Sequence, residues 1–456
     1  MKNKLYFLII IVSNSMMANI TLPSIFSDDM VLQRNSEIKI WGWANPKEEV
    51  KITPSWNNQE YKIVADSNAN WSITIPTPKE GGPYIISLNG YNSIILKNIM
   101  IGEVWLCSGQ SNMEMNANWG IKNGDEEATK ATNTNIRFFS VEKASAETPQ
   151  NNLSGNWTEC SPQIMKKNSA VAYFFANRIT EDLRDVPIGM IVSAWGATSA
   201  EVWIPKKEIE SNQDLLEASK KINPNEYCPV GAGKTFNAMI NPLIGYKIAG
   251  VLWYQGESNV GSTIYDKTFS ALITSWRSLW KQDFPFYFVQ IAPYKNGDDR
   301  YSSVLIRDFQ RRTLQLPNTA MVVTSDISTT DDIHPKDKKS VGVRLANLAL
   351  SNIYKTNSNV VNGPLYKEQK ITKNKITVLF DYADGLYFKD KKNNQFEIAG
   401  SDTIFYNAKA EIKNNEIILT SDKVKKPTKV RFAWENAVQS QLFNKANLPA
   451  SSFISE

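Results

Sequence analysis

Histidine is the scarcest ionisable residue in this sequence: among 456 residues there is one, His334. A catalytic or metal centre that needs two histidines is therefore excluded. Cysteine is nearly as scarce, with three examples, Cys107, Cys160 and Cys228. Their spacing matches no zinc motif, which excludes a cysteine-based zinc site. Cys107 lies in an apolar run and is predicted to be buried, whereas Cys160 and Cys228 could either pair in an oxidising compartment or stay free.

Long apolar runs are also missing, since no segment approaches the ~20 residues that a membrane-spanning helix needs. The run at residues 5–12 follows two lysines and precedes small residues, a pattern typical of a cleaved secretory leader. We therefore expect a signal peptide at residues 1–18 and a periplasmic or secreted protein.

Strong charge of either sign is absent as well. The formal net charge is +5, and no dense cluster of lysine and arginine occurs. Binding to nucleic-acid phosphates normally needs such a cluster. The composition therefore argues against a nucleic-acid partner, and the short apolar runs argue against a membrane partner.

The chain divides into three regions by its hydrophobic patterning. In residues 19–98, the segments EIKIWGW, EVKITPSW and NWSITIP alternate apolar and polar residues and are separated by turn signals, which predicts a small β-sandwich. In residues 356–456, the segments KITVLFDYADGLYFK, EIILTS and KVRFAWEN predict a C-terminal β-rich domain. The first of these contains Asp384-Gly385, a dipeptide typical of a β-hairpin turn.

The middle region, residues 99–355, has a different pattern. Apolar runs at residues 186–196, 248–259 and 319–327 predict buried strands, and residues 342–354 predict a closing helix. Strands that alternate with helices indicate a mostly parallel sheet with helices on both faces. This region is therefore predicted to be an α/β domain.

Polar residues follow four of the predicted strands. They are residues 108–112 (SGQSN), 195–198 (WGAT), 255–259 (QGESN) and the loop 329–335 (TTDDIHP). In an open parallel sheet, ligands bind beyond the carboxyl ends of the strands, so these four segments are expected to meet. Each of them alone could be an ordinary loop or helix cap, but their joint occurrence at strand ends favours a site.

These segments contain the groups that acyl transfer needs. A serine hydroxyl becomes nucleophilic when a base takes its proton, and a neutral imidazole is suited to that role. A carboxylate on the far ring nitrogen fixes the imidazole tautomer. Asp331 precedes His334 by three residues, and Asp332 could serve instead. The first segment offers two serines, Ser108 and Ser111.

The same segments resemble the ordered blocks of a known superfamily. GQSNM, the glycine in SAWGATSAEVW, WYQGESN and DDIHP resemble the blocks of SGNH hydrolases and, more narrowly, of the sialate O-acetylesterase family of carbohydrate esterases. LPSIFSDDMVLQR, GNWTECSP, IRDFQ and the helix after HPKDK extend the similarity to about residue 354. The resemblance implies a flavodoxin-like parallel sheet with helices on both faces.

The resemblance also implies roles for individual residues. Ser111, not Ser108, matches the nucleophile, His334 the base and Asp331 the carboxylate that orients it. The backbone N–H groups of Ser111 and Gly196 match donors of the oxyanion hole. No metal or cofactor is implied.

The third oxyanion donor is where the sequence departs from the superfamily. A Gly-x-Asn-Asp pattern is replaced here by QGESN, so the resemblance favours the side chain of Gln255, with Asn259 as the less favoured alternative. Arg307, in IRDFQ, is a candidate for binding the carboxylate of the sugar.

The implied activity is removal of O-acetyl groups, including 9-O-acetyl groups, from sialic acids. An acetylesterase acting on xylan or pectic sugars is the first alternative, because similar folds act on them. Two alternatives belong to other classes, namely a non-catalytic sugar-binding protein and a serine peptidase. Loss of the serine, histidine or aspartate would be typical of the non-catalytic protein. All three residues are present.

Overall fold

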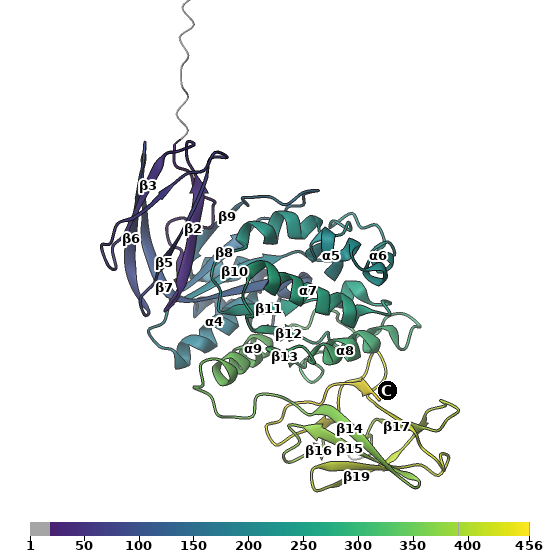
Figure 1. Cartoon of the computed structure of the whole chain (residues 1–456). Helices are drawn as coiled ribbons and strands as arrows, with labels where there is room; N and C mark the ends of the chain where they lie inside the picture. The colour runs from purple at the N-terminus through teal and green to yellow at the C-terminus, as the bar shows by residue number, and fades with distance from the viewer. Residues whose placement is uncertain (1–18, 391, 456) are drawn as a thin grey trace, which may run out of the picture.

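The computed structural model describes residues 19–390 and 392–455 (Figure 1). The predicted signal peptide at residues 1–18 lies outside the described residues. In the described part of the chain, no helix combines the length and apolar character that crossing a membrane requires.

The N-terminal strands form two small sheets. β2 pairs with β5, whereas β4, β3, β6 and the start of β7 pair antiparallel in turn, and β1 lies parallel to β7. Alternate residues of β2, such as Ile38 and Ile40, are buried in one core with Val50 and Ile52 of β3. This is the arrangement of the predicted β-sandwich. The bounds of these strands are β1 (Val31–Gln33), β2 (Glu37–Trp43), β3 (Glu49–Pro54), β4 (Tyr61–Val64), β5 (Asn70–Pro76), β6 (Gly81–Asn89) and β7 (Ser93–Gly109).

Strand β7 connects this region to the central sheet. It is 17 residues long. Its first half pairs with β6, and its second half pairs with β10 and β11. The predicted boundary at residues 98–99 therefore falls inside one continuous strand, at an irregularity where Asn98 has a φ of +56° and the pairing with β6 shifts register.

The central sheet has the order β13-β12-β11-β7-β10-β8-β9. All neighbours in it are parallel except β8 and β9. Without the two edge strands β8 and β9, the order is 2-1-3-4-5, which is the flavodoxin-like order that the resemblance implies. The order reverses at β7, so a ligand site is expected beyond its carboxyl end. The bounds are β8 (Ile136–Val141), β9 (Gly155–Glu159), β10 (Ile188–Ala194), β11 (Gly250–Tyr254), β12 (Phe286–Val289) and β13 (Thr319–Val322).

Helices cover both faces of this sheet, as predicted. Val104 and Leu106 of β7 pack in the same core as α7 and α8, whereas Trp105 and Cys107 pack with α4 and α9. This alternation follows from the two-residue period of a strand. The four helices are α4 (Ala170–Asp182), α7 (Tyr265–Trp280), α8 (Ser302–Thr313) and α9 (Lys338–Asn352).

Shorter helices and turns connect these elements. They are α1 (Ser111–Glu114), α2 (Gly124–Thr129), α3 (Pro162–Lys167), α5 (Lys206–Glu210), α6 (Gln213–Ser219), η1 (Ala117–Trp119), η2 (Ala200–Trp203), η3 (Phe236–Ile240), η4 (Asn241–Leu243) and η5 (Glu257–Asn259).

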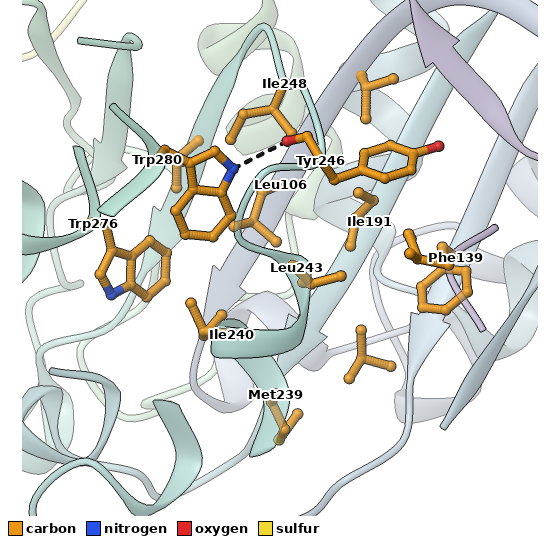
Figure 2. Packing of buried hydrophobic residues seen from close by; sticks show 14 of the residues in the cluster. Leu106, Phe139, Ile191, Met239, Ile240, Leu243, Tyr246, Ile248, Trp276 and Trp280 are labelled. Carbon is orange, nitrogen blue, oxygen red and sulfur yellow. Dashed lines mark hydrogen bonds between the residues drawn. The ribbon is translucent and has the colours of Figure 1, made fainter. Parts of the chain in front are cut away.

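The core on the α7 side joins three neighbouring strands. Figure 2 shows Leu106, Phe139 and Ile191, from β7, β8 and β10, beneath the segment that ends at Tyr246. The indole Nε1 of Trp280 donates to Tyr246 O at 3.0 Å. The Tyr246 hydroxyl in turn donates to Val31 O at 2.7 Å, so this core also holds the N-terminal strands.

The C-terminal region has its own core and three small sheets. Their orders are β14-β15-β20-β19, β18-β17-β21-β23 and β16-β22. The bounds are β14 (Leu365–Thr372), β15 (Lys375–Asp381), β16 (Tyr387–Phe388), β17 (Phe396–Ala399), β18 (Tyr406–Asn407), β19 (Lys409–Lys413), β20 (Glu416–Thr420), β21 (Lys429–Phe432), β22 (Leu442–Phe443) and β23 (Phe453–Ile454).

The hairpin predicted at Asp384-Gly385 is not formed. Gly385 has the positive φ of a turn, +66°, but the strands on either side of it belong to different sheets. β15 pairs with β14 and β20, so both of its edges are occupied, and β16 pairs with β22 instead.

Candidate active site

Ser111 lies directly after the carboxyl end of β7. The strand ends at Gly109, where φ is +134° and a Cβ atom would lie 2.2 Å from Tyr254 O. The next backbone N–H, of Gln110, donates to the same Tyr254 O at 3.0 Å. This tight turn makes Ser111 the first residue of α1, so its N–H has no acceptor within the helix. Ser111 is partly exposed.

The other serine of this segment has a different environment. Ser108 belongs to β7, is fully buried, and its hydroxyl has no hydrogen-bond partner among the described residues. The structure therefore places Ser111, and not Ser108, where a substrate can reach it.

The one histidine of the chain lies beside Ser111. His334 Nε2 and Ser111 Oγ are 2.9 Å apart, although 223 residues separate them in sequence. The loop between β13 and α9 carries His334 to this position. Burial lowers the pKa of His334, the nearby Lys338 ammonium lowers it further, and Asp332 opposes both effects. The imidazole is therefore kept in the neutral form that can accept a proton from serine.

The carboxylates of the His334 loop are not arranged as predicted. The backbone N–H of His334 donates to Asp332 Oδ1 at 2.8 Å. Asp331 is exposed, and a hydrogen bond from Thr329 lowers the pKa of its carboxyl group. Among the described residues no hydrogen bond joins Asp331 to the imidazole, and Asp332, the alternative, bonds to the His334 backbone and not to the ring. Asp332 is the carboxylate whose charge acts on the pKa of His334.

This difference predicts opposite behaviour for two neighbouring variants. Asp332→Asn is expected to lower kcat/KM for ester hydrolysis by roughly 10- to 100-fold, because the negative charge next to the developing imidazolium is removed. Asp331→Asn makes the same chemical change one residue earlier. Its kcat/KM is expected to stay within about twofold of that of the parent enzyme. A larger loss in Asp331→Asn than in Asp332→Asn would contradict the placement described here.

Gly196, the predicted second oxyanion donor, lies next to Ser111. A Cβ atom on Gly196 would be 3.4 Å from Ser111 Cβ. Its N–H, however, already donates to Glu114 Oε2 at 2.8 Å, and the other oxygen of Glu114 pairs with Lys143 Nζ at 2.5 Å. An acetyl carbonyl can therefore use this N–H only after the Glu114 carboxylate has moved.

Neither candidate for the third donor presents a free amide. Gln255 Nε2 donates to Asn259 Oδ1 at 2.6 Å and to Thr198 O at 3.2 Å, and its Oε1 accepts from the Tyr265 hydroxyl. Asn259 Nδ2 donates to both carboxylate oxygens of Glu201, at 3.1 and 2.9 Å. Both amides are buried. In this structure both amides are engaged in hydrogen bonds that hold the loop after β11 in place.

Arg307 is a correction to the sequence-based prediction. Its side chain is buried, with 1 % of its surface exposed, and burial lowers its pKa to about 9. The guanidinium donates to the backbone oxygens of Glu435 and Asn436, at 2.6 and 3.1 Å. Arg307 therefore attaches α8 to the C-terminal region and is not available to a substrate carboxylate.

The three cysteines are all free. Cys160 belongs to the core on the α4 side, whereas the Cys228 thiol donates to Ala197 O at 3.2 Å, beside the Gly196 loop. The pairing of Cys160 with Cys228 is therefore not formed. Within the described residues, no group of three histidine, cysteine, aspartate or glutamate side chains is arranged to hold a metal ion.

A cavity of 620 Å³ lies beside the Gly196 loop. Its lining includes Ala197 and Ser258, which belong to the predicted segments 195–198 and 255–259, and Glu201. The backbone N–H groups of Gly256 and Ser258 donate to Gln110 Oε1, so the loop bordering the cavity is joined to the turn that carries Ser111.

Three functional-site residues were missed by the sequence analysis: Asn112, Glu257 and Lys338. Asn112 Nδ2 donates to Glu257 Oε1 at 2.5 Å, and Lys338 Nζ donates to Asn112 Oδ1 at 2.5 Å. Each lies inside a segment already singled out, namely GQSNM, QGES and HPKDK. Their position beside Ser111 and His334 in those segments is the signal that could have identified them.

The chain was compared with known proteins. A family model described as a carbohydrate esterase, sialic acid-specific acetylesterase, matches residues 101–351. The sialate O-acetylesterase of Homo sapiens is 29% identical over 421 residues, covering 82% of this chain and 79% of the human protein. That of Mus musculus is 28% identical over 453 residues, covering 85% and 83%.

A solved structure is similar over almost the whole chain. It is a carbohydrate acetylesterase from Xanthomonas citri, 31% identical, with a TM-score of 0.86. The match covers 96% of this chain and 99% of that one, so it includes both β regions as well as the central sheet.

Proposed function

The chain belongs to the sialic acid-specific acetylesterase family of carbohydrate esterases, and on that premise we propose that it removes O-acetyl groups, including 9-O-acetyl groups, from sialic acids through a covalent acetyl-enzyme on Ser111. The observation that carries the proposal is the 2.9 Å separation of Ser111 Oγ and His334 Nε2 at the switch point of the sheet. A nucleophile and a base within hydrogen-bond reach are the minimum that acyl transfer requires.

The reaction then has two halves. Ser111 Oγ attacks the acetyl carbonyl carbon while its proton passes to His334 Nε2. When the tetrahedral intermediate collapses, the bond to the sugar oxygen breaks, and His334 returns the proton to that oxygen. Water then attacks the acetyl-enzyme with His334 again as base, releasing acetate and regenerating Ser111. These residues supply every proton transfer, so no cofactor is required.

Charge stabilisation comes from three groups. The Ser111 N–H, which has no acceptor within α1, is available to the oxyanion, and the Gly196 N–H joins it once Glu114 has moved. Asp332 stabilises the imidazolium that forms on His334.

A sialic acid also carries a carboxylate that needs a cation. With Arg307 engaged elsewhere, Lys143 is the candidate, because its ammonium pairs with Glu114, whose other oxygen is on the Gly196 N–H. Its side chain is 45% exposed. The sugar carboxylate would replace Glu114 as the partner of Lys143, and the acetyl carbonyl would replace it on Gly196.

A second candidate function is an acetylesterase acting on plant polysaccharides such as xylan or pectic sugars. The similarity to the Xanthomonas citri structure supports this second candidate, because that protein is described as a carbohydrate acetylesterase and the match covers nearly the whole of this chain.

Acetate release from 9-O-acetylated sialic acid and from acetylated xylan, measured side by side, separates the two functions. We expect faster release from the sialic acid. In Lys143→Met, KM for the sialic acid is expected to rise about tenfold, while hydrolysis of uncharged 4-nitrophenyl acetate stays unchanged.

The matched control is Lys234→Met. Lys234 also pairs with a glutamate at the surface, Glu147 at 2.6 Å, and its loss should leave KM unchanged. Faster release from xylan, with no effect of Lys143→Met, would move the enzyme to the second function.

A further inference from the structure

A polar cluster lies behind Ser111 and His334, formed by Asn112, Glu257 and Lys338. Asn112 and Lys338 are fully buried. Glu257 is partly buried, and its Oε2 atom is buried without a hydrogen-bond partner among the described residues. The proposed reaction uses none of these side chains directly, and buried charges are costly unless they are paired. Their presence beside the site therefore calls for a role.

Asn112 connects the two segments that carry the nucleophile and the base. It follows Ser111 in sequence, and its Nδ2 donates to Ile333 O, the residue before His334, at 3.1 Å. The same amide nitrogen donates to Glu257 Oε1 at 2.5 Å, and the amide oxygen accepts from Lys338 Nζ at 2.5 Å. Both ends of the amide are thus held, which fixes its orientation and with it the separation of the two segments.

Lys338 brings a positive charge to this cluster. It is the first residue of α9, and its Nζ lies 5.1 Å from the centroid of the Tyr254 ring. Burial lowers the pKa of Lys338 to about 7, while Glu257 and Asp332 oppose that effect. The Glu257 and Asp332 carboxylates favour the ammonium form, which donates to Asn112 Oδ1.

The charged groups that act on His334 come from two elements, Asp332 on its own loop and Lys338 on α9. Glu257, on η5, acts on Lys338 and hydrogen-bonds to Asn112. Lys338 lowers the pKa of His334 and Asp332 raises it. Removal of the lysine charge must therefore raise the pKa of the imidazole.

We propose that Asn112, Glu257 and Lys338 form one positioning unit, in which the Asn112 amide, held by Glu257 and Lys338, fixes the separation of Ser111 and His334 and keeps the Lys338 ammonium close to the His334 segment. The catalytic meaning of this unit rests on the proposed function, but the effect of Lys338 on His334 can be measured without any substrate.

The single histidine makes the measurement direct. Protein produced without a histidine tag and labelled with ¹³C at the imidazole Cε1 gives one ring signal in NMR, and the pH titration of that signal reports His334 alone. Lys338→Met is expected to move the titration midpoint upward by about one pH unit. The control is Lys339→Met on the same helix, because Lys339 Nζ pairs with Glu127 at 2.9 Å instead of joining the cluster. Its midpoint should equal that of the parent protein.

A second variant covers the case in which Lys338→Met does not fold, since it leaves Glu257 without its cation. Lys338→Met combined with Glu257→Gln removes both charges and is expected to show the same upward shift. A midpoint equal to that of the parent protein in a folded variant would overturn the proposal.

Activity on 4-nitrophenyl acetate separates this inference from the proposed function. The acidic limb of the pH profile of kcat/KM is expected to shift with the NMR midpoint, and Asn112→Ala should lower kcat by about 100-fold at unchanged KM. A shifted NMR midpoint in an enzyme that hydrolyses no ester would contradict the proposed function and leave the effect of Lys338 standing. If the parent enzyme is active but the acidic limb of the kcat/KM profile does not shift in Lys338→Met, the inference is contradicted and the proposed function is not.

Discussion

Ser111→Ala is expected to lower kcat/KM for acetyl ester hydrolysis by roughly 10⁴- to 10⁶-fold. The variant loses the only oxygen that lies 2.9 Å from His334 Nε2 in the described structure, so neither attack nor proton transfer can occur through it. His334→Ala is expected to lose a similar amount, because an unactivated serine is a poor nucleophile. The double variant should be little worse than either single one, since the two residues act as a unit.

The matched control is Ser108→Ala, three residues earlier. Ser108 is buried, its hydroxyl has no partner among the described residues, and alanine fits the same space. Its activity should remain within about twofold of the parent enzyme. Full activity in Ser111→Ala would overturn the mechanism, whereas loss of acetate release in Ser111→Ala and His334→Ala would exclude a non-catalytic sugar-binding protein.

The second large effect concerns the turn before the nucleophile. Gly109→Ala is expected to lower the free energy of unfolding by more than about 4 kcal/mol, because the new Cβ would lie 2.2 Å from Tyr254 O at a φ of +134°. Backbone in neighbouring strands cannot yield without breaking the pairing of β7 with β11. The melting temperature, followed by circular dichroism, measures this loss.

Gly120→Ala is the control for backbone conformation alone. Gly120 has a φ of +82° and nothing within 4 Å of a Cβ atom, so its substitution should cost about 1–2 kcal/mol. A melting temperature of Gly109→Ala equal to that of Gly120→Ala would show that the approach to Tyr254 is not what requires the glycine.

The architecture of the central domain could be predicted because its strands are buried on both faces. Continuous apolar runs such as those of β10 and β11 identify a parallel sheet, and the polar residues after them identify its functional edge. The domain boundary could not be predicted at β7, where a single strand serves two sheets without a turn. At Asp384-Gly385, Gly385 has a positive φ, but the predicted hairpin is not formed, because the pairing of the flanking strands depends on edges that only the tertiary structure fills.

The sequence predicted which segments form the site, but it did not predict the hydrogen bonds within it. His334 follows from the rarity of histidine, the strand ends offer Ser108 and Ser111, and the choice of Ser111 follows from the family resemblance. The choice between Asp331 and Asp332 depends on which carboxylate closes a tight turn, and spacing does not reveal that. Arg307 lies in a polar-looking motif, yet it is buried because helix α8 turns it toward the C-terminal region.

For the same reason, hydrogen-bond partners that lie far apart in sequence could not be predicted. The amide of Gln255 donates to Thr198 O, 57 residues away in sequence, and Lys338 reaches Asn112 across 226 residues of sequence. Both contacts join segments that follow different strands, so each depends on the finished sheet.

Covalent labelling tests the central claim most directly. The protein is incubated with a fluorophosphonate, which reacts with activated serines, and the modified peptide is identified by mass spectrometry. The account predicts one modified residue, Ser111, with no labelling in Ser111→Ala and strongly slowed labelling in His334→Ala. Modification of another serine at the same rate, or unmodified Ser111 in a preparation that releases acetate from O-acetylated sialic acid, would contradict it.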